Sequence, residues 1–144
     1  MTATVIECPG CNARNRVADD ATGRPRCSKC HTDLPWLIET GAAGFDTIVT
    51  TSALPVLVDL WAPWCGPCVA VAPILHQLST ERAGSLRIVK VNVDESPGVS
   101  AQLGVQGIPT MLLFSGGTEI ARQVGALPAD ALRNWLDTSL AARG

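Results

Sequence analysis

The stretch Trp61–Leu75 reads WAPWCGPCVAVAPIL and directly follows the apolar run LPVLVDL. The apolar run is typical of a buried strand, and the residues that follow Cys65 are typical of a helix. Cys65 is therefore expected where a strand passes into a helix. At a helix N-terminus the positive end of the helix dipole and the free backbone N–H groups favour thiolate over thiol. The sequence thus predicts a nucleophilic sulfur at Cys65.

The spacing of Cys65 and Cys68 predicts a redox pair. Cys68 lies on the same helix face, where it can attack a mixed disulfide formed by Cys65 and release the reduced product. Gly66 and Pro67 suit a tight helix entry, because proline near a helix start removes no hydrogen bond that the helix needs. A purely structural disulfide would not persist where thiols are kept reduced. These arguments favour thiol–disulfide exchange.

The N-terminal segment carries a separate cysteine pattern, C-x2-C-x15-C-x2-C, and this spacing is typical of a four-thiolate zinc site. Residues 1–33 are polar and turn-rich with no periodic apolar face, so we expect one structural zinc ion to order them. Two separate reducible pairs, and redox sensing by metal release, stay open as alternatives. His31 is expected to be a solvated neighbour, because four thiolates already close the site. The predicted ligands are Cys8, Cys11, Cys27 and Cys30.

From Leu34 onward, strand-like and helix-like segments alternate. This alternation predicts an α/β fold, a central mixed sheet flanked by helices on both faces. We expect a small zinc-ribbon-like module at 1–33 and one larger domain at 34–144. The expected strands are 36–39, 55–61 and 86–92, the expected helices are 45–52, 65–82, 97–103 and 129–142, and a hairpin over 110–124 turns at Gly116 and Gly117.

The charge and hydropathy of the chain exclude several classes of partner. The formal net charge is -2, and neither the first 40 residues nor the rest carries a cationic excess suited to nucleic acid. No apolar run approaches the ~18 residues that a membrane-spanning helix needs. The start MTATVIECPG lacks the basic and apolar regions of a secretory signal. We therefore expect a cytoplasmic protein with reduced thiols and no membrane partner.

The motif WCGPC after VLVDLWA, with Ile108-Pro109-Thr110 some forty residues later, closely resembles the thioredoxin family. The added double Cys-x-x-Cys resembles the family's thioredoxin-2 branch, in which a zinc-binding segment precedes the thioredoxin domain. The resemblance covers essentially the whole chain. It implies a monomeric protein disulfide reductase without a bound organic cofactor. It also implies disulfide-containing protein substrates and an NADPH-dependent thioredoxin reductase as partners.

The resemblance also implies roles for residues around the cysteine pair. Asp59 matches the buried acid that helps to deprotonate Cys68, and Lys90 matches its neighbouring lysine. An ordinary strand acid and a solvated strand lysine are the alternatives. X-Pro bonds are mostly trans, but the resemblance implies a cis bond before Pro109. The implied docking rim for partner disulfides comprises Trp64, Gly66, Pro67, Ile108, Pro109 and Gly125, although each of these could serve only packing or a turn.

One residue departs from the family pattern. Val69 follows Cys68 where the family commonly carries lysine or arginine, so a positive charge near the thiols is missing. This departure bears on redox tuning and on the fit to a reductase. Two alternative functions stay open. One is a zinc-switched redox sensor with a chaperone-like surface, and the other is an oxidase or isomerase on the same fold.

Overall fold

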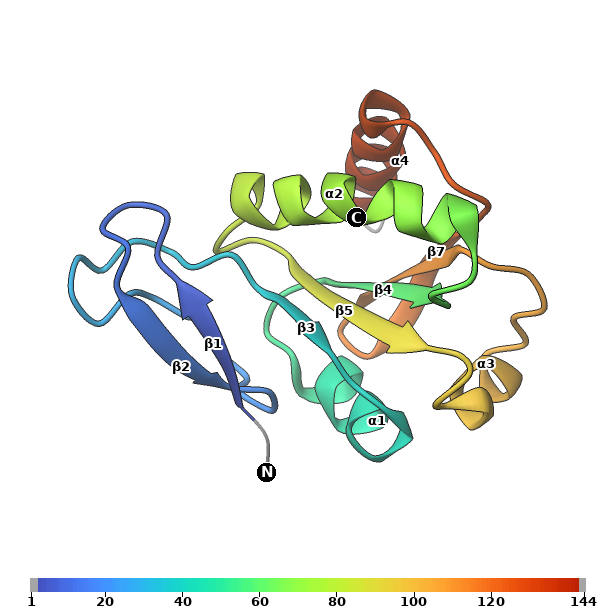
Figure 1. Ribbon diagram of the computed structural model, residues 1–144, viewed down its shortest axis with the longest axis horizontal. Coiled ribbons are helices and arrows are strands. Elements are labelled where there is room, and N and C mark those ends of the chain that lie inside the picture. Colours follow the sequence, from blue (N-terminus) through green and yellow to red (C-terminus); the bar gives the residue numbers. More distant parts are fainter. Residues whose placement is uncertain (1–2, 143–144) are drawn as a thin grey trace.

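A five-stranded mixed sheet forms the centre of the computed structural model, which describes residues 3–142 (Figure 1). Its strand order is β3-β5-β4-β6-β7. The first three of these strands run parallel, and β6 and β7 add antiparallel pairings. The strands are β3 (Leu37–Glu39), β5 (Arg87–Asn92), β4 (Val56–Trp61), β6 (Thr110–Ser115) and β7 (Thr118–Val124).

Two helices cover each face of this sheet, as Figure 1 shows. One face carries α1 (Ala42–Thr51) and α3 (Pro97–Gln102), and the other carries α2 (Gly66–Glu81) and α4 (Ala129–Ala142). Side chains alternate along a strand, so β4 contributes Val58 to the α1 face and Leu57 to the α2 face. The prediction of a mixed sheet flanked by helices is therefore confirmed. No helix within residues 3–142 is long and apolar enough to cross a membrane.

The helix and strand boundaries differ slightly from those expected. The first helix, α1, begins at Ala42 rather than at residue 45, because its first turn consists of small residues that show no apolar periodicity. The hairpin turn lies at Gly116 and Gly117 as predicted. Their φ angles of 59° and 82° are in the left-handed region that glycine adopts without steric cost.

The N-terminal segment contains a two-stranded antiparallel hairpin that sequence reasoning missed. Its strands are β1 (Ala3–Glu7) and β2 (Arg14–Ala18). Only Ile6 and Asn15 within these strands are buried, so the five-residue stretches carry almost no apolar alternation. The connection between them is occupied by the first cysteine pair rather than by a recognisable hairpin turn.

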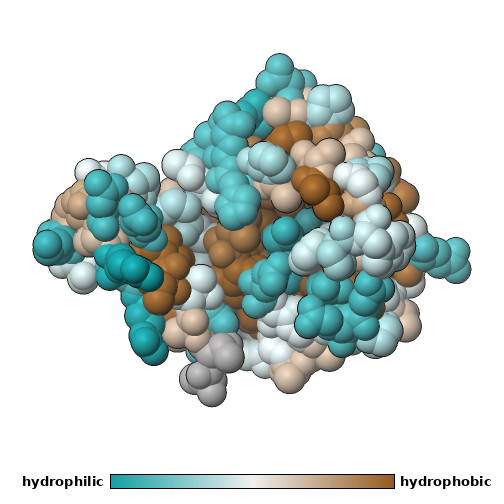
Figure 2. All heavy atoms as spheres, in the orientation of Figure 1, coloured by the Kyte–Doolittle hydropathy of each residue, from teal (hydrophilic) through white to brown (hydrophobic). Residues whose placement is uncertain are grey.

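The hairpin and the two cysteine pairs form a lobe beside the sheet, and apolar surface lines the hollow between the two (Figure 2). The lobe is joined to the sheet through one continuous core. Cys8 and Cys27 belong to the same buried cluster as Leu34, Trp36 and Phe45. The N-terminal residues therefore share apolar burial with the α1 face of the sheet.

Arg87, at the start of β5, connects the lobe to the sheet. The side chain is fully buried, and its guanidinium carbon lies 3.8 Å from the centre of the Trp36 ring. It donates hydrogen bonds to the carbonyl of Ala21, at 2.9 Å, and to the carbonyl of Asp19. Burial lowers the pKa of Arg87 to about 10, opposed by the nearby carboxylates of Asp19 and Asp20. A buried cation of this kind is costly unless its partners stay in place.

The substitution Arg87→Met is expected to lower the free energy of unfolding by about 2 kcal/mol. Methionine keeps most of the apolar volume but loses the contact with Trp36 and removes the donor from two partly buried carbonyls. Urea denaturation of the oxidised protein measures the change. Arg14→Met, on an exposed position of β2, is the matched control and should change stability by less than about 0.5 kcal/mol. Equal values for the two variants would contradict the connecting role of Arg87.

Candidate functional site

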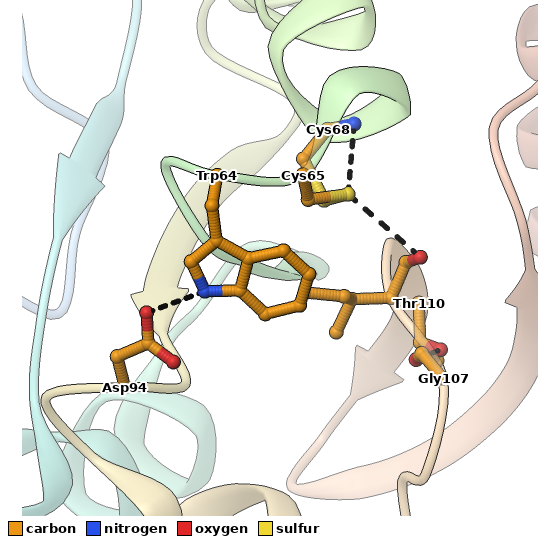
Figure 3. Close-up of a disulfide and its surroundings, with 7 residues drawn as sticks. Trp64, Cys65, Cys68, Asp94, Gly107 and Thr110 are labelled. Atoms are coloured by element: carbon orange, nitrogen blue, oxygen red, sulfur yellow. Dashed lines mark hydrogen bonds between the residues drawn. A yellow bond between two sulfur atoms is a disulfide. The ribbon is translucent and has the colours of Figure 1, made fainter.

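Cys65 and Cys68 form a disulfide at the N-terminus of α2 (Figure 3). Their Cα atoms are 5.2 Å apart, within the range that disulfides require. Cys65 is the N-cap residue, and the backbone N–H of Cys68 donates a hydrogen bond to the Cys65 Sγ atom at 3.2 Å. Cys65 is 6% exposed and Cys68 is 2% exposed, so Cys65 is the more accessible residue of the pair. In the reduced protein, the same N–H group would stabilise a thiolate at Cys65.

The loop before β6 faces this disulfide. The Ile108-Pro109 peptide bond is cis, as the family resemblance implied and as sequence statistics alone would not suggest. The Ile108 carbonyl oxygen lies 3.9 Å from Cys65 Sγ. The Pro109 carbonyl accepts a hydrogen bond from the backbone N–H of Gly125 at 2.8 Å, and the Thr110 hydroxyl donates to the Gly107 carbonyl at 2.6 Å. These bonds fix the loop beside the sulfurs.

Exposed apolar side chains gather near the disulfide. Three of the four large hydrophobic residues that are exposed in residues 3–142 are Trp64, Val69 and Val124. Trp64 is 70% exposed, and its indole N–H donates a 2.8 Å hydrogen bond to the Asp94 carboxylate (Figure 3). Sequence reasoning missed Asp94 and Val124. Asp94 is 30 residues from Trp64 in the chain, and no local pattern joins the two.

Asp59 lies in the middle of β4 and points to the face covered by α2, because its neighbours Val58 and Leu60 belong to the α1 face. It is completely buried, and neither carboxylate oxygen has a hydrogen-bond partner among the residues that the structure describes. Burial raises the pKa of Asp59 to about 6, and the charge of Lys90 opposes this increase. An acid with such a pKa can both accept and release a proton near neutral pH.

Lys90 is the cross-strand neighbour of Asp59. The lysine is only 9% exposed, and its Nζ atom lies 4.3 Å from the centre of the Trp61 ring. The ammonium group is therefore held against an aromatic face rather than in solvent. Asp59 and Lys90 are therefore both buried, whereas the alternative interpretation of the sequence expected side chains in solvent at these two positions.

The four N-terminal cysteines converge, with all four Sγ atoms within 4.8 Å of one another. Two of the contacts, Cys8 to Cys30 and Cys11 to Cys27, are 3.5 Å each. The ring nitrogens of His31 are not part of this group. A tetrahedral zinc ion with Zn–S bonds of about 2.3 Å requires sulfur separations of about 3.8 Å. The described cysteines therefore fit a four-thiolate metal site.

The two Cys-x-x-Cys segments repeat one backbone geometry. Cys8 accepts a hydrogen bond at its carbonyl from Asn12, and Cys27 accepts one in the same way from His31. Asn12 and His31 each have a φ of 64°, in the left-handed region. The Sγ atoms of Cys8 and Cys27 also accept backbone N–H groups at 3.4 Å, from Gly10 and Lys29 respectively. Such turns direct two sulfurs of each segment toward one point.

Comparisons with known proteins place these features in a family. The family model for thioredoxin matches residues 37–138. A protein named thioredoxin from Haemophilus influenzae is 50% identical over 95 residues, which cover 66% of this chain and 89% of the relative. Thioredoxin C-3 from Corynebacterium nephridii is 39% identical over 139 residues, which cover 94% of this chain and 95% of the relative. This second similarity extends into the four-cysteine segment.

Proposed function

Because the chain belongs to the thioredoxin family, which has protein disulfide oxidoreductase activity, we propose that it works as a disulfide reductase through Cys65 and Cys68. The observation that carries the proposal is the position of the cysteine pair. Cys65 caps α2 and is the more exposed residue of the pair, and the N–H of Cys68 can stabilise negative charge on its sulfur. A thiolate in this position is a good nucleophile toward disulfides.

The reaction proceeds in two exchanges. The Cys65 thiolate attacks one sulfur of the substrate disulfide, which forms a mixed disulfide and releases the other substrate sulfur as a thiolate. The Cys68 thiolate then attacks Cys65 Sγ, which closes the Cys65–Cys68 disulfide and releases the second substrate thiolate. Asp59 accepts the Cys68 proton before this second attack. Two electrons pass to the substrate, and an NADPH-dependent thioredoxin reductase returns them to the pair.

The substrate docks on the surface around the pair. Trp64 supplies an exposed apolar face that Asp94 holds in place. The Ile108 carbonyl is directed toward Cys65, so it can accept a backbone N–H from an extended substrate segment. The complete proposed rim comprises Trp64, Gly66, Pro67, Ile108, Pro109 and Gly125.

The Cys68→Ser substitution tests this assignment of roles. Without the resolving sulfur, Cys65 is expected to stay attached to the substrate, so a mixed disulfide should accumulate with a stoichiometry close to one substrate per chain. Non-reducing gels and mass spectrometry of the linked peptide measure this product. Attachment through a cysteine of the N-terminal segment, or no attachment at all, would contradict the assignment.

The N-terminal segment is proposed to bind one structural zinc ion. Cys8, Cys11, Cys27 and Cys30 would hold the ion, which would supply cross-linking rather than chemistry because four thiolates leave no open position. The convergence of the sulfurs and the repeated turn geometry support this proposal. Residues 1–33 then form a zinc-binding module and residues 34–144 the thioredoxin domain, joined through the core around Trp36.

Purified protein is expected to contain one zinc ion per chain, measured by atomic emission. A Cys11→Ser variant should lose most of this zinc, because one of the four ligands has been removed. Cys65→Ser is the matched control, since it removes a thiol outside the cluster and should leave the zinc content unchanged. Zinc loss in the control, or full zinc content in the Cys11→Ser variant, would contradict the proposed ligand set.

A further inference from the structure

Val69 is an exposed apolar side chain beside the redox pair. It directly follows Cys68 near the start of α2, and it is 54% exposed. Its backbone N–H donates a 3.1 Å hydrogen bond to the Cys65 carbonyl, so Val69 lies one helical turn beyond Cys65. Side chains in this relation are about 6 Å apart. The proposed reaction and the proposed docking rim do not use Val69.

The exposed face of α2 continues from Val69 without charge. Ala70 and Pro73 are also exposed, and Pro73 lies one helical turn beyond Val69. Residues 61–80 contain no aspartate, glutamate, lysine or arginine. The first charged residue of α2 is Glu81, at the far end of the helix, where it forms an ion pair with α4. Val69, Ala70 and Pro73 therefore make an uncharged strip, called here the α2 strip, that starts at the cysteine pair.

The other segments that border the disulfide also lack charge. Residues 96–118, which include the loop before β6, and residues 123–129 contain no aspartate, glutamate, lysine or arginine. Between these segments, Glu119 and Arg122 of β7 form an ion pair with each other. The carboxylate of Asp94 accepts an indole N–H. A charged group on a substrate therefore finds little complementary charge around the cysteine pair.

An extended substrate can reach the α2 strip while its disulfide lies at Cys65. The Ile108 carbonyl oxygen, 3.9 Å from Cys65 Sγ, is the proposed acceptor for the substrate backbone. Two residues of an extended segment span about 7 Å, which is close to the separation expected between Cys65 and Val69. Side chains two residues apart also point to the same side of an extended segment. The side chain two positions from the attacked cysteine is therefore placed to contact Val69.

We propose that Val69 determines substrate specificity, and that the α2 strip binds an apolar side chain two residues from the attacked cysteine. The inference rests on the proposed function, and it assigns to it a substrate class, disulfide polypeptides with a leucine-like residue at that position. An apolar side chain gains by leaving water for the strip. A polar side chain at the same place would lose water without gaining a hydrogen-bond partner from the side chains of Val69, Ala70 and Pro73.

Matched disulfide peptides test this proposal. One series carries a single leucine at successive positions on either side of the cysteine, and its counterpart carries asparagine, which has nearly the same shape. The wild-type protein is expected to reduce the leucine peptide with kcat/KM about fivefold higher when the residue is two positions from the cysteine. Val69→Thr keeps the shape and charge of the side chain and should lower this preference to about twofold. Val5→Thr, at an exposed position of β1, is the matched control and should preserve the preference.

A charged variant separates docking from an effect on the thiols. Val69→Lys should favour a peptide with glutamate at the same position about fivefold over the leucine peptide, and added salt should remove this preference. The ratio of the two kcat/KM values is independent of changes in the Cys65 nucleophile, because both peptides meet the same sulfur. The wild-type preference for leucine should persist at high salt. Equal changes for both peptides in Val69→Lys would mean that the residue acts only on the thiols, and the proposal would be wrong.

A titration distinguishes this inference from the proposed reductase function. A leucine peptide without cysteine is titrated into the full chain, and the methyl NMR signals of Val69 are followed, with those of Val5 as the internal control. Shifts at Val69 alone would support the α2 strip even if no disulfide peptide were reduced, an outcome that contradicts only the reductase. With no reduction, the absence of shifts would overturn both proposals. Equal kcat/KM for the leucine and asparagine series, or a preference that Val69→Thr leaves unchanged, would overturn the specificity proposal and leave the reductase in place.

Discussion

The substitution Cys65→Ser is expected to lower the rate of disulfide reduction by more than about a thousandfold. The sulfur at this position forms the first covalent bond with the substrate, and a serine hydroxyl remains protonated at neutral pH and does not exchange with disulfides. The helix N-terminus that stabilises a thiolate cannot ionise an alcohol. Turnover of insulin disulfides, with NADPH and a thioredoxin reductase as the electron source, measures the loss.

Two further variants show whether the loss of activity is specific to Cys65. Cys30→Ser removes a sulfur from the N-terminal cluster and is expected to keep most of the activity, because that sulfur does not belong to the redox pair. Cys68→Ser is expected to lose multiple turnover but to keep the first exchange. If Cys65→Ser reduced insulin at the wild-type rate, the nucleophile would lie elsewhere and the proposed reaction would be wrong.

The sequence predicted most of the sheet because its strands are buried on both faces. The runs around Leu57 and Val89 are almost entirely buried and mostly apolar, as strands covered by two helix layers require, with Asp59 and Lys90 as their internal charged residues. The start of α2 was predicted from Gly66 and Pro67, whose local preferences agree with the fold. In these segments local propensity, pattern and tertiary packing all favour the same structure.

The features that sequence reasoning missed depend on contacts between distant residues. In the sequence, Arg87 is a single polar residue at the end of an expected strand. Its burial is explained only by its contact with the Trp36 ring and its hydrogen bond to the Ala21 carbonyl. Asp94 likewise gains its role from Trp64, 30 residues earlier. The cis bond before Pro109 was implied by family resemblance, because local sequence alone favours trans. Such contacts have no periodic signal along the chain.

The effect of the substitution Asp59→Asn on the free energy of unfolding is expected to depend on pH. At pH 8 the substitution should be about 3 kcal/mol more stabilising than it is at pH 3. Asp59 has a pKa of about 6 in the folded protein, against an ordinary value of 3.8, because burial disfavours its charge. The folded state therefore binds the proton more tightly than the unfolded state does. Wild-type stability should fall as the pH rises from about 4 to about 6. Above pH 6 the folded protein carries the full free-energy cost of the buried Asp59 charge.

Asparagine carries no charge at any of these pH values, so the variant should lack this pH-dependent loss of stability. Urea denaturation of the oxidised protein at several pH values measures the effect without titration of Cys65 and Cys68. Asp46→Asn, at an exposed position of α1, is the control and should keep the wild-type pH profile. A profile for Asp59→Asn that parallels wild type between pH 4 and pH 7 would mean that Asp59 is ionised in the fold without cost. Its proposed role as the proton acceptor for Cys68 would then lose its physical basis, because a carboxylate with an ordinary pKa is too weak a base to deprotonate a thiol efficiently.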